Sequence, residues 1–221
     1  ALINACRVLG RDPAKLRVVI SGAGAAATAI AQLLRGVNFA DADWEPVEDI
    51  VVCDSRGAIH AGRAGLSPEK EALLAYTNQA AHTGSVHEVL EGADVFIGVS
   101  KGGLLAAGDI QRMAEAPIIL AMANPEPEIM PDVALAAGAA IVGTGRSDFP
   151  NQVNNVLAFP GIFRGALDAG ARVIDGAMKV AAAHALAAAV ADPLPERILP
   201  QPMDRSVAPL IAEAVRRAVG Q

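Results

Sequence analysis

Aromatic residues and positive charge are both scarce in this sequence. Only 3% of the 221 residues are Phe, Trp or Tyr, and 18 Lys and Arg against 24 Asp and Glu give a formal net charge of −6. A nucleic-acid-binding surface needs clustered basic side chains and, for single strands, aromatic side chains on which bases stack. The composition therefore argues against a nucleic-acid partner.

Cysteines and long apolar runs are scarce as well. The two cysteines, Cys6 and Cys53, cannot build the disulfide framework of a small secreted protein, which favours a reducing compartment. The longest apolar run, 180–191, contains His184 and is too short to span a bilayer. No signal-peptide pattern opens the chain. We therefore expect a cytoplasmic protein with no membrane partner.

What the sequence does contain is a high apolar content in an alternating pattern of strands and helices. Apolar types make up 52% of the residues, which excludes disorder caused by a lack of core-forming side chains. Several β-branched runs lack the alternation of a sheet with one wet face, so they predict strands buried on both faces. These predicted strands are 17–21, 50–54, 95–99, 118–122 and 140–143. Helical spacing between them occurs at 25–34, 71–76, 85–90, 109–114 and 131–137.

Repeated strand–helix units of this kind predict a Rossmann-like α/β fold, a doubly wound parallel sheet flanked by helices. The strand signals end at about residue 149. Helical patterns at 162–167, 175–190 and 208–219 then predict a C-terminal helical extension.

The segment 22–27 reads Gly-Ala-Gly-Ala-Ala-Ala and fits the G-x-G-x-x-A pattern between a strand and a helix. Gly22 permits a tight turn, Gly24 lets a diphosphate approach the backbone, and Ala27 lets the helix pack closely on the strand. The helix N-terminus offers oriented N–H groups to the anion. The alternative is a glycine turn that serves packing alone. The cofactor-binding residues predicted here are Gly22, Ala23, Gly24, Ala25 and Ala26.

Asp54 ends the second predicted strand, where a carboxylate accepts hydrogen bonds from the adenosine ribose of NAD. It lies farther from the glycines than the usual ~20 residues, because a polar insert occupies residues 41–45. Ser55 and Arg56 follow directly, and Arg56 would instead pair with the 2′-phosphate of NADP. The sequence leaves the choice between NAD and NADP open.

Polar groups also follow the other three predicted strands, and parallel strands bring their carboxyl ends to one edge of a sheet. Ser100 and Lys101 lie in the glycine-rich loop 98–103, and Asn124 lies in an Asn-Pro turn. The segment 143–155 is dense in amides, hydroxyls and charges and predicts a substrate-lining loop. The alternatives are a solvated Lys101, a turn-capping Asn124 and a polar surface loop with a helix cap.

Metal ligands are not evident in the sequence. The four histidines form no H-x-H or H-x-x-x-H pair, and the two cysteines are far apart, so a zinc site is not expected. Glu128 and Asp132 are predicted either to lie at a helix N-terminus, where the dipole favours them, or to bind a metal.

The motifs together resemble the bacterial malic enzymes. The resemblance covers nearly the whole chain in order, and its most specific segments are Ala-Asn-Pro-Glu-Pro-Glu at 123–128 and the polar stretch 144–155. The other matching segments are 19–26, 52–57 and 159–168.

This resemblance implies oxidative decarboxylation of (S)-malate to pyruvate and CO₂ with NAD or NADP and Mg²⁺ or Mn²⁺. In the family, the catalytic lysine and tyrosine and the acidic metal ligands lie in an N-terminal domain, so none is expected in this chain. Asn124 and Asn155 match the asparagines that hold malate and the nicotinamide. Gly22, Gly24 and Asp54 match cofactor-binding positions, and Ala25 does as well.

The resemblance also implies a division of the chain. Residues 1–15 are expected to end a helix that enters from the missing N-terminal domain, 16–172 to form the NAD(P)-binding domain, and 173–221 to pack on it. A homodimer or higher homo-oligomer is expected, and the chain alone is expected to be inactive. The alternatives are another NAD(P)-dependent dehydrogenase, with Lys101 as its base, or a non-catalytic dinucleotide-binding module.

Overall fold

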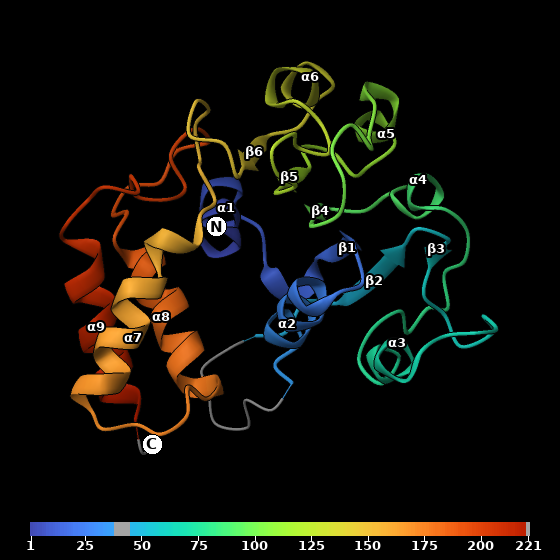
Figure 1. The fold of residues 1–221 in the computed structure, drawn as a ribbon. Helices are drawn as coiled ribbons and strands as arrows, with labels where there is room; N and C mark the ends of the chain where they lie inside the picture. The colour runs from blue at the N-terminus through green and yellow to red at the C-terminus, as the bar shows by residue number, and fades with distance from the viewer. Residues whose placement is uncertain (38–44, 220–221) are drawn as a thin grey trace.

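The computed structural model describes residues 1–37 and 45–219. Of the polar insert predicted at 41–45, only Glu45 falls within the described residues. The described chain contains one six-stranded sheet with the strand order β3-β2-β1-β4-β5-β6 (Figure 1). Its strands are β1 (Arg17–Ser21), β2 (Asp49–Asp54), β3 (Gly57–Ala58), β4 (Val95–Gly98), β5 (Ile118–Ala121) and β6 (Ile141–Thr144).

Helices connect and flank these strands. They are α1 (Leu2–Leu9), α2 (Ala25–Leu34), α3 (Pro68–Leu73), α4 (Val86–Val89), α5 (Ala107–Gln111), α6 (Pro131–Ala136), α7 (Phe159–Asp168), α8 (Gly176–Ala188) and α9 (Val207–Ala218). Two short 3₁₀ segments, η1 (Pro13–Lys15) and η2 (Asn155–Leu157), complete the described elements. Within these ranges, no helix is both long and apolar enough to cross a membrane.

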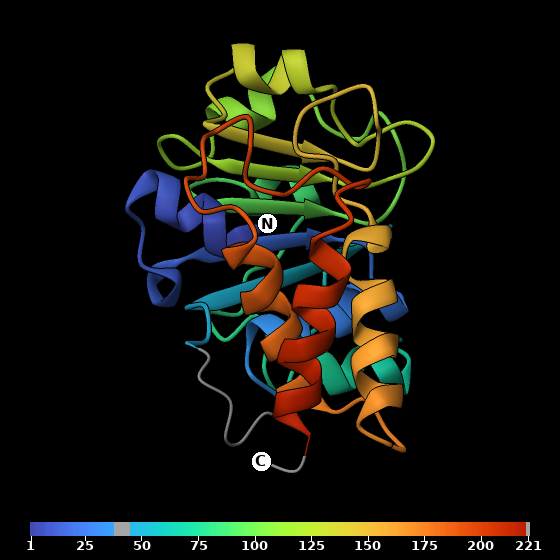
Figure 2. The same cartoon turned by 90° about the vertical axis from the view of Figure 1, so that its left-hand side faces the viewer.

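The predicted Rossmann-like parallel sheet is confirmed. Pairing is parallel between β1 and β2, β1 and β4, β4 and β5, and β5 and β6. The short β3, which the sequence did not predict, pairs antiparallel with β2 through two residues. All the parallel strands point to one side of the molecule, the side on which α7 lies (Figure 2). Their carboxyl ends therefore form one edge.

Each face of the sheet is covered by its own set of helices. Val18 and Ile20 of β1 pack in a cluster with residues of α1 and α2, such as Ala27. Val19, between them, packs on the opposite face with residues of α4, α5 and α6, such as Ala134. Because successive strand residues point to opposite faces, both faces need apolar side chains. This explains the continuous apolar runs that predicted the strands.

The last three helices pack against one another in a separate apolar cluster (Figure 1). α7 lies so close to α9 that a Cβ on Gly161 would come within 2.6 Å of the Cβ of Ile211. The predicted division at residue 172 would separate α7 from its packing partners. The shared apolar cluster thus joins α7, which precedes the predicted division, to α8 and α9, which follow it.

Candidate cofactor site

The candidate site lies where the strand order reverses. From β1 the chain runs to β2 on one side, and β4 later pairs with β1 on the other side. Such a switch point leaves a crevice at the carboxyl ends of the two strands, which is where open α/β sheets bind ligands. The glycine turn follows β1 at this point, and the Val99 N–H donates to the Ser21 carbonyl across it at 2.9 Å.

The two glycines of the turn serve different needs. Gly22 has a φ of +115°, and a Cβ there would lie 2.7 Å from the Val99 carbonyl oxygen, so the turn itself requires glycine. Gly24 has no such constraint, because a Cβ on it would find no protein atom within 4 Å. The space beside Gly24 is therefore open on the ligand side of the turn.

The start of α2 fits a bound diphosphate. Gly24 is the N-cap residue and has no side chain to accept from the first N–H groups of the helix. Ala25 and Ala26 are exposed, whereas Ala27 is fully buried against the sheet. N–H groups at the start of a ten-residue helix, with open space beside them, have the geometry and partial charge that suit an anion.

Asp54 ends β2 beside this turn, and its carboxylate is fully engaged. Arg63 donates to both of its oxygens at 2.6 and 2.5 Å, Lys70 donates at 2.6 Å, and the Arg56 backbone N–H donates at 2.8 Å. These four hydrogen bonds occupy the roughly four acceptor positions of an ionised carboxylate. As it stands, Asp54 has no acceptor position left for ribose hydroxyls.

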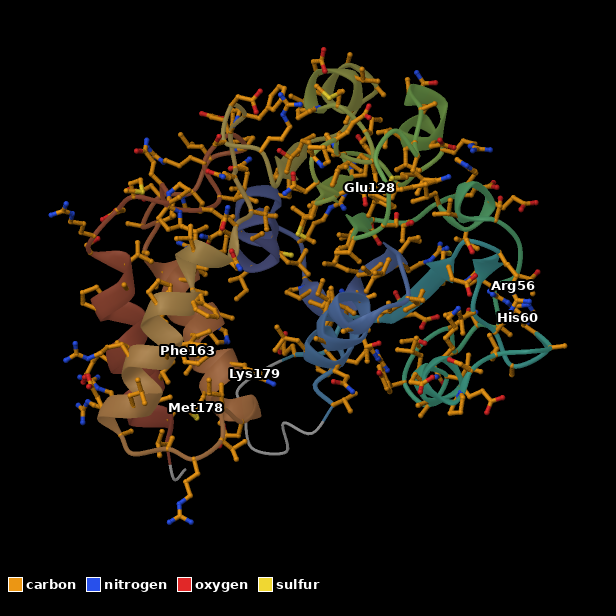
Figure 3. The ribbon with its side chains drawn as sticks, viewed as in Figure 1. Arg56, His60, Glu128, Phe163, Met178 and Lys179 are labelled. Atoms are coloured by element: carbon orange, nitrogen blue, oxygen red, sulfur yellow. The ribbon has the colours of Figure 1, made fainter. Side chains whose placement is uncertain are left out.

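The cluster around Asp54 has a net positive charge, because Arg63 and Lys70 both pair with this one carboxylate. Burial raises the pKa of Asp54, but the hydrogen bonds from Arg63, Lys70 and the Arg56 backbone outweigh it and hold the pKa well below its ordinary value. Arg56 is exposed and lies at the β2–β3 end of the sheet (Figure 3). Within the described residues, its guanidinium donates only to the Gly65 carbonyl at 3.2 Å. Ser55, which lies between Asp54 and Arg56 in the sequence, is also exposed.

We expect Asp54→Asn to lower the free energy of unfolding at pH 7 by about 2 to 3 kcal/mol, because it leaves the Arg63 guanidinium, with only 10% of its side chain exposed, without a counter-charge. A folded-state pKa below the unfolded one stabilises the native state above the ordinary pKa of Asp. That contribution is lost as the pH falls. The difference in unfolding free energy between the unsubstituted chain and Asp54→Asn should therefore become smaller below about pH 4. Urea unfolding at several pH values measures it.

The exposed pair Arg164–Asp168 provides the control for this prediction, since Asp168→Asn should leave stability unchanged. Equal effects of the two substitutions at pH 7 would contradict the importance of the Asp54 cluster.

The ends of β4 and β5 meet next to the glycine turn. The hydroxyl of Ser21 lies 2.9 Å from the hydroxyl of Ser100, which follows β4. Asn124 follows β5 in a cis Asn124–Pro125 turn; its side chain is exposed and makes no hydrogen bond to another described residue. The alternative interpretation, in which the Asn124 side chain caps this turn through a local hydrogen bond, is therefore not supported.

The position of Glu128 differs from both positions expected from the sequence, a helix N-terminus and a metal site. Asp132 lies in the first turn of α6 as predicted, but Glu128 is completely buried and accepts hydrogen bonds from the backbone of Ser100 and Ala123. It therefore does not lie at a helix N-terminus, and it belongs to no group of described residues arranged to hold a metal ion. The sequence Pro-Glu-Pro-Glu at 125–128 gave no indication that the Glu128 side chain would be buried.

Part of the polar loop 143–155 is structural. The buried Asn151 donates to the carbonyls of Val142 and Pro195 at 3.0 and 2.7 Å and accepts from the Ile198 N–H. Asn154 caps η2, and Arg146 pairs with Asp148. These contacts account for much of the polar density that the sequence assigned to substrate.

Asn155 differs from these neighbours. The Val153 N–H donates to the Thr144 carbonyl at 2.7 Å, which returns the chain to the carboxyl end of β6 two residues before Asn155. The Asn155 side chain is exposed and makes no hydrogen bond to another described residue. The glycine turn, Ser100, Asn124 and the segment that ends at Asn155 therefore follow strand ends on one edge.

Sequence comparison assigns this arrangement to a family. The family described as "Malic enzyme, NAD binding domain" matches residues 1–219. The chain belongs to the malic enzyme family. It corresponds to that family's NAD(P)-binding domain, so the dinucleotide function that the glycine motif predicts is shared by its relatives.

Several malic enzymes are similar over nearly all of this chain. A bifunctional malic/malolactic enzyme of Bacillus subtilis is 50% identical over 98% of the chain and 52% of its own length. An NADP-dependent malic enzyme of Escherichia coli is 43% identical over 99% of the chain and 30% of its own length. The crystal structure of an NAD-dependent malic enzyme from Thermotoga maritima superposes with a TM-score of 0.90 at 38% identity, over 97% of this chain and 55% of that one. The chain thus spans about half or less of the length of these relatives.

A divalent metal does not fit the residues of this malic enzyme domain. In the two described ranges, no group of three or more His, Cys, Asp or Glu is arranged to hold a metal ion. Both cysteines are buried, and burial raises the pKa of Cys53 to about 12.

Proposed function

We propose that this chain is the cofactor-binding part of an enzyme that oxidises and decarboxylates (S)-malate to pyruvate and CO₂. The observation that carries the proposal is the shared edge: the open glycine turn, Ser100, Asn124 and the segment leading to Asn155 all follow strand ends that point the same way. One dinucleotide can contact residues of several strands only if those residues share an edge.

Each group of residues has a distinct task in this proposal. Residues 22–26 hold the diphosphate through backbone N–H groups at the start of α2. When bound, the nicotinamide supplies the acceptor for the hydride that leaves C2 of malate. Asn124 and Asn155 orient malate and the carboxamide of the nicotinamide, since a side-chain amide both donates and accepts. Neither side chain has to break a hydrogen bond within the described chain to do so.

At the adenosine end of the site we propose a preference for NADP⁺. The Asp54 oxygens already accept four hydrogen bonds, whereas a 2′-phosphate would meet the exposed guanidinium of Arg56, whose backbone N–H donates to the same carboxylate as Arg63 and Lys70. Two cations pair with the single Asp54 carboxylate, and the third cation, Arg56, follows two residues later, so an additional anion is favoured there. An unengaged Asp54 would have favoured NAD⁺ instead.

Arg56→Ala tests both the site and the preference. We expect the substitution to raise the Kd of NADP⁺ about tenfold, the value of one charge-assisted contact, and to change the Kd of NAD⁺ less than about twofold. Isothermal titration calorimetry of each cofactor against the chain measures both. The exposed Arg205 lies in the connection that leads into α9, and α9 is on the opposite side of the molecule from β3 (Figure 1), so Arg205→Ala is the matched control and should leave both Kd values unchanged. Equal loss of both cofactors, or tighter binding of NAD⁺ by the unsubstituted chain, would contradict the NADP⁺ assignment.

The complete enzyme would supply what this chain does not hold. We propose that the base, the acid and a Mg²⁺ or Mn²⁺ site belong to the part of the relatives' length that this chain does not span. The metal there would act as a Lewis acid on the keto group. The free, buried state of Cys6 and Cys53 suits the reducing cytosol that we propose as the location of the enzyme.

An exposed apolar stripe on α7 supports a further partner for this domain. Phe159, Phe163 and Leu167 recur at four-residue spacing and are 57%, 46% and 74% exposed. The centroids of the two phenylalanine rings are 4.6 Å apart, with the ring planes tilted by 42° (Figure 3). A contiguous apolar stripe is a typical protein contact surface. We propose that the remaining part of the complete enzyme, or a second subunit of its homo-oligomer, covers α7.

A further inference from the structure

Glu128 is a completely buried carboxylate with no role in the function proposed so far. It lies in the connection between β5 and α6, beneath the carboxyl ends of the strands (Figure 3). In the described part of the chain no Lys, Arg or His forms a salt bridge with it. Burying a carboxylate is costly unless its oxygens are hydrogen-bonded. The positions of its donors therefore show what the side chain does.

The donors belong to the loops that carry the candidate site. Oε1 accepts from the Ser100 N–H at 3.0 Å, and Oε2 accepts from the Ala123 N–H, next to Asn124, at 3.0 Å. The Ser100 hydroxyl lies 3.5 Å from Oε1 and 2.9 Å from the hydroxyl of Ser21. One side chain thus connects the ends of β4 and β5 directly and that of β1 through Ser100.

The space for this carboxylate is built into the sheet. A Cβ on Gly98, the last residue of β4, would overlap the Glu128 carboxyl group. The backbone adds two further links, since the Leu105 N–H donates to the Glu128 carbonyl at 2.8 Å and the Gly103 N–H donates to the Pro127 carbonyl at 3.0 Å. The loop after β4 is therefore held at both its start and its end by the segment 127–128.

We propose that Glu128 is a positioning residue for the nicotinamide and substrate end of the site. It holds the Ser100 loop and the Asn124 turn in one arrangement before the ligand binds. The entropy cost of ordering these two loops therefore does not reduce the binding affinity. Both oxygens are needed, because each accepts from the backbone of a different loop. This inference rests on the proposed function, since it assumes that a dinucleotide occupies the edge.

Glu128→Gln tests this role, because it replaces one acceptor by an NH₂ group that faces a backbone N–H. Two ligands are compared by calorimetry: ADP, which carries only the adenosine and diphosphate parts, and whichever of NAD⁺ and NADP⁺ the unsubstituted chain binds more tightly. We expect the Kd of the full cofactor to rise about tenfold, as for one lost buried hydrogen bond, and the Kd of ADP to change less than about twofold. A merely structural role would not separate the two ligands.

Glu126→Gln is the matched control, because Glu126 lies in the same turn but is exposed, and it should leave both Kd values unchanged. Equal weakening of both ligands by Glu128→Gln, or no weakening of either, would overturn the positioning role. If that variant does not fold, Glu128→Asp keeps the charge but withdraws it by one methylene, and it must show the same selective loss. Failure of the unsubstituted chain to bind either ligand would instead overturn the proposed function, and the role of Glu128 with it.

Discussion

No reduced cofactor is expected when this chain is incubated with (S)-malate, Mn²⁺ and either NAD⁺ or NADP⁺. The described residues offer no metal site. Tyr76, the one tyrosine of the sequence, is half-buried at the apolar cluster of the sheet, and burial raises its pKa. Lys70 is paired with Asp54. Each missing acid, base or Lewis acid removes a factor of about 10² to 10⁴, so the combined loss places turnover below detection.

This result depends on a folded chain, which the cofactor titration establishes on the same sample. Absorbance at 340 nm, the band of reduced nicotinamide, follows the reaction. Turnover at a rate typical of complete malic enzymes would refute the assignment of the chemistry to residues outside this chain. Lys101→Ala would then decide the mechanism, because Lys101 is exposed in the loop after β4 and is the base of the alternative dehydrogenase. Loss of that turnover in Lys101→Ala would establish the alternative.

Substitution of the two glycines of the turn should give opposite results. Gly24→Val should abolish measurable binding of NAD⁺ and NADP⁺, because its side chain enters the open space that the diphosphate needs. The melting temperature should fall only by a few degrees, since a Cβ at this position meets no protein atom within 4 Å and the main cost is that of a poorer N-cap.

Gly22→Ala should act on folding first. The alanine must adopt a φ of +115° and place its Cβ 2.7 Å from a carbonyl oxygen, which should cost about 2 to 4 kcal/mol of unfolding free energy. Thermal unfolding and calorimetry on the same samples separate the two effects. Strong cofactor binding by a folded Gly24→Val variant would show that the diphosphate is not held at the start of α2. A Gly22→Ala variant as stable as the unsubstituted chain would contradict the strain argument for the turn.

The elements that sequence reasoning located best are those determined by neighbouring residues. α2 and β1 begin and end where their patterns predicted. α4 lies within the predicted range 85–90 and starts after a capping box, in which Ser85 and Glu88 each accept from the other's backbone N–H. β3 was missed because a two-residue strand carries no periodicity and forms only by pairing with β2. The 3₁₀ segment at Asn155 is similarly short.

For the site, the sequence alone determined the glycine turn, the start of α2 and the set of strand ends that form one edge. The glycine turn follows from backbone sterics and the start of α2 from the unpaired N–H groups at a helix end, and both are local properties of the sequence. The shared edge follows from the common direction of parallel strands, which is a property of the whole fold. Only the tertiary structure decided that Asp54 is saturated by Arg63 and Lys70, and that Asn151 is structural while Asn155 is exposed. It also decided that Glu128 connects two loops beneath the surface. Apart from Glu128 and Ala123, which are 5 positions apart, the residues joined by these contacts are 9 to 28 positions apart, and whether they meet depends on the path of the intervening chain rather than on any pattern within it.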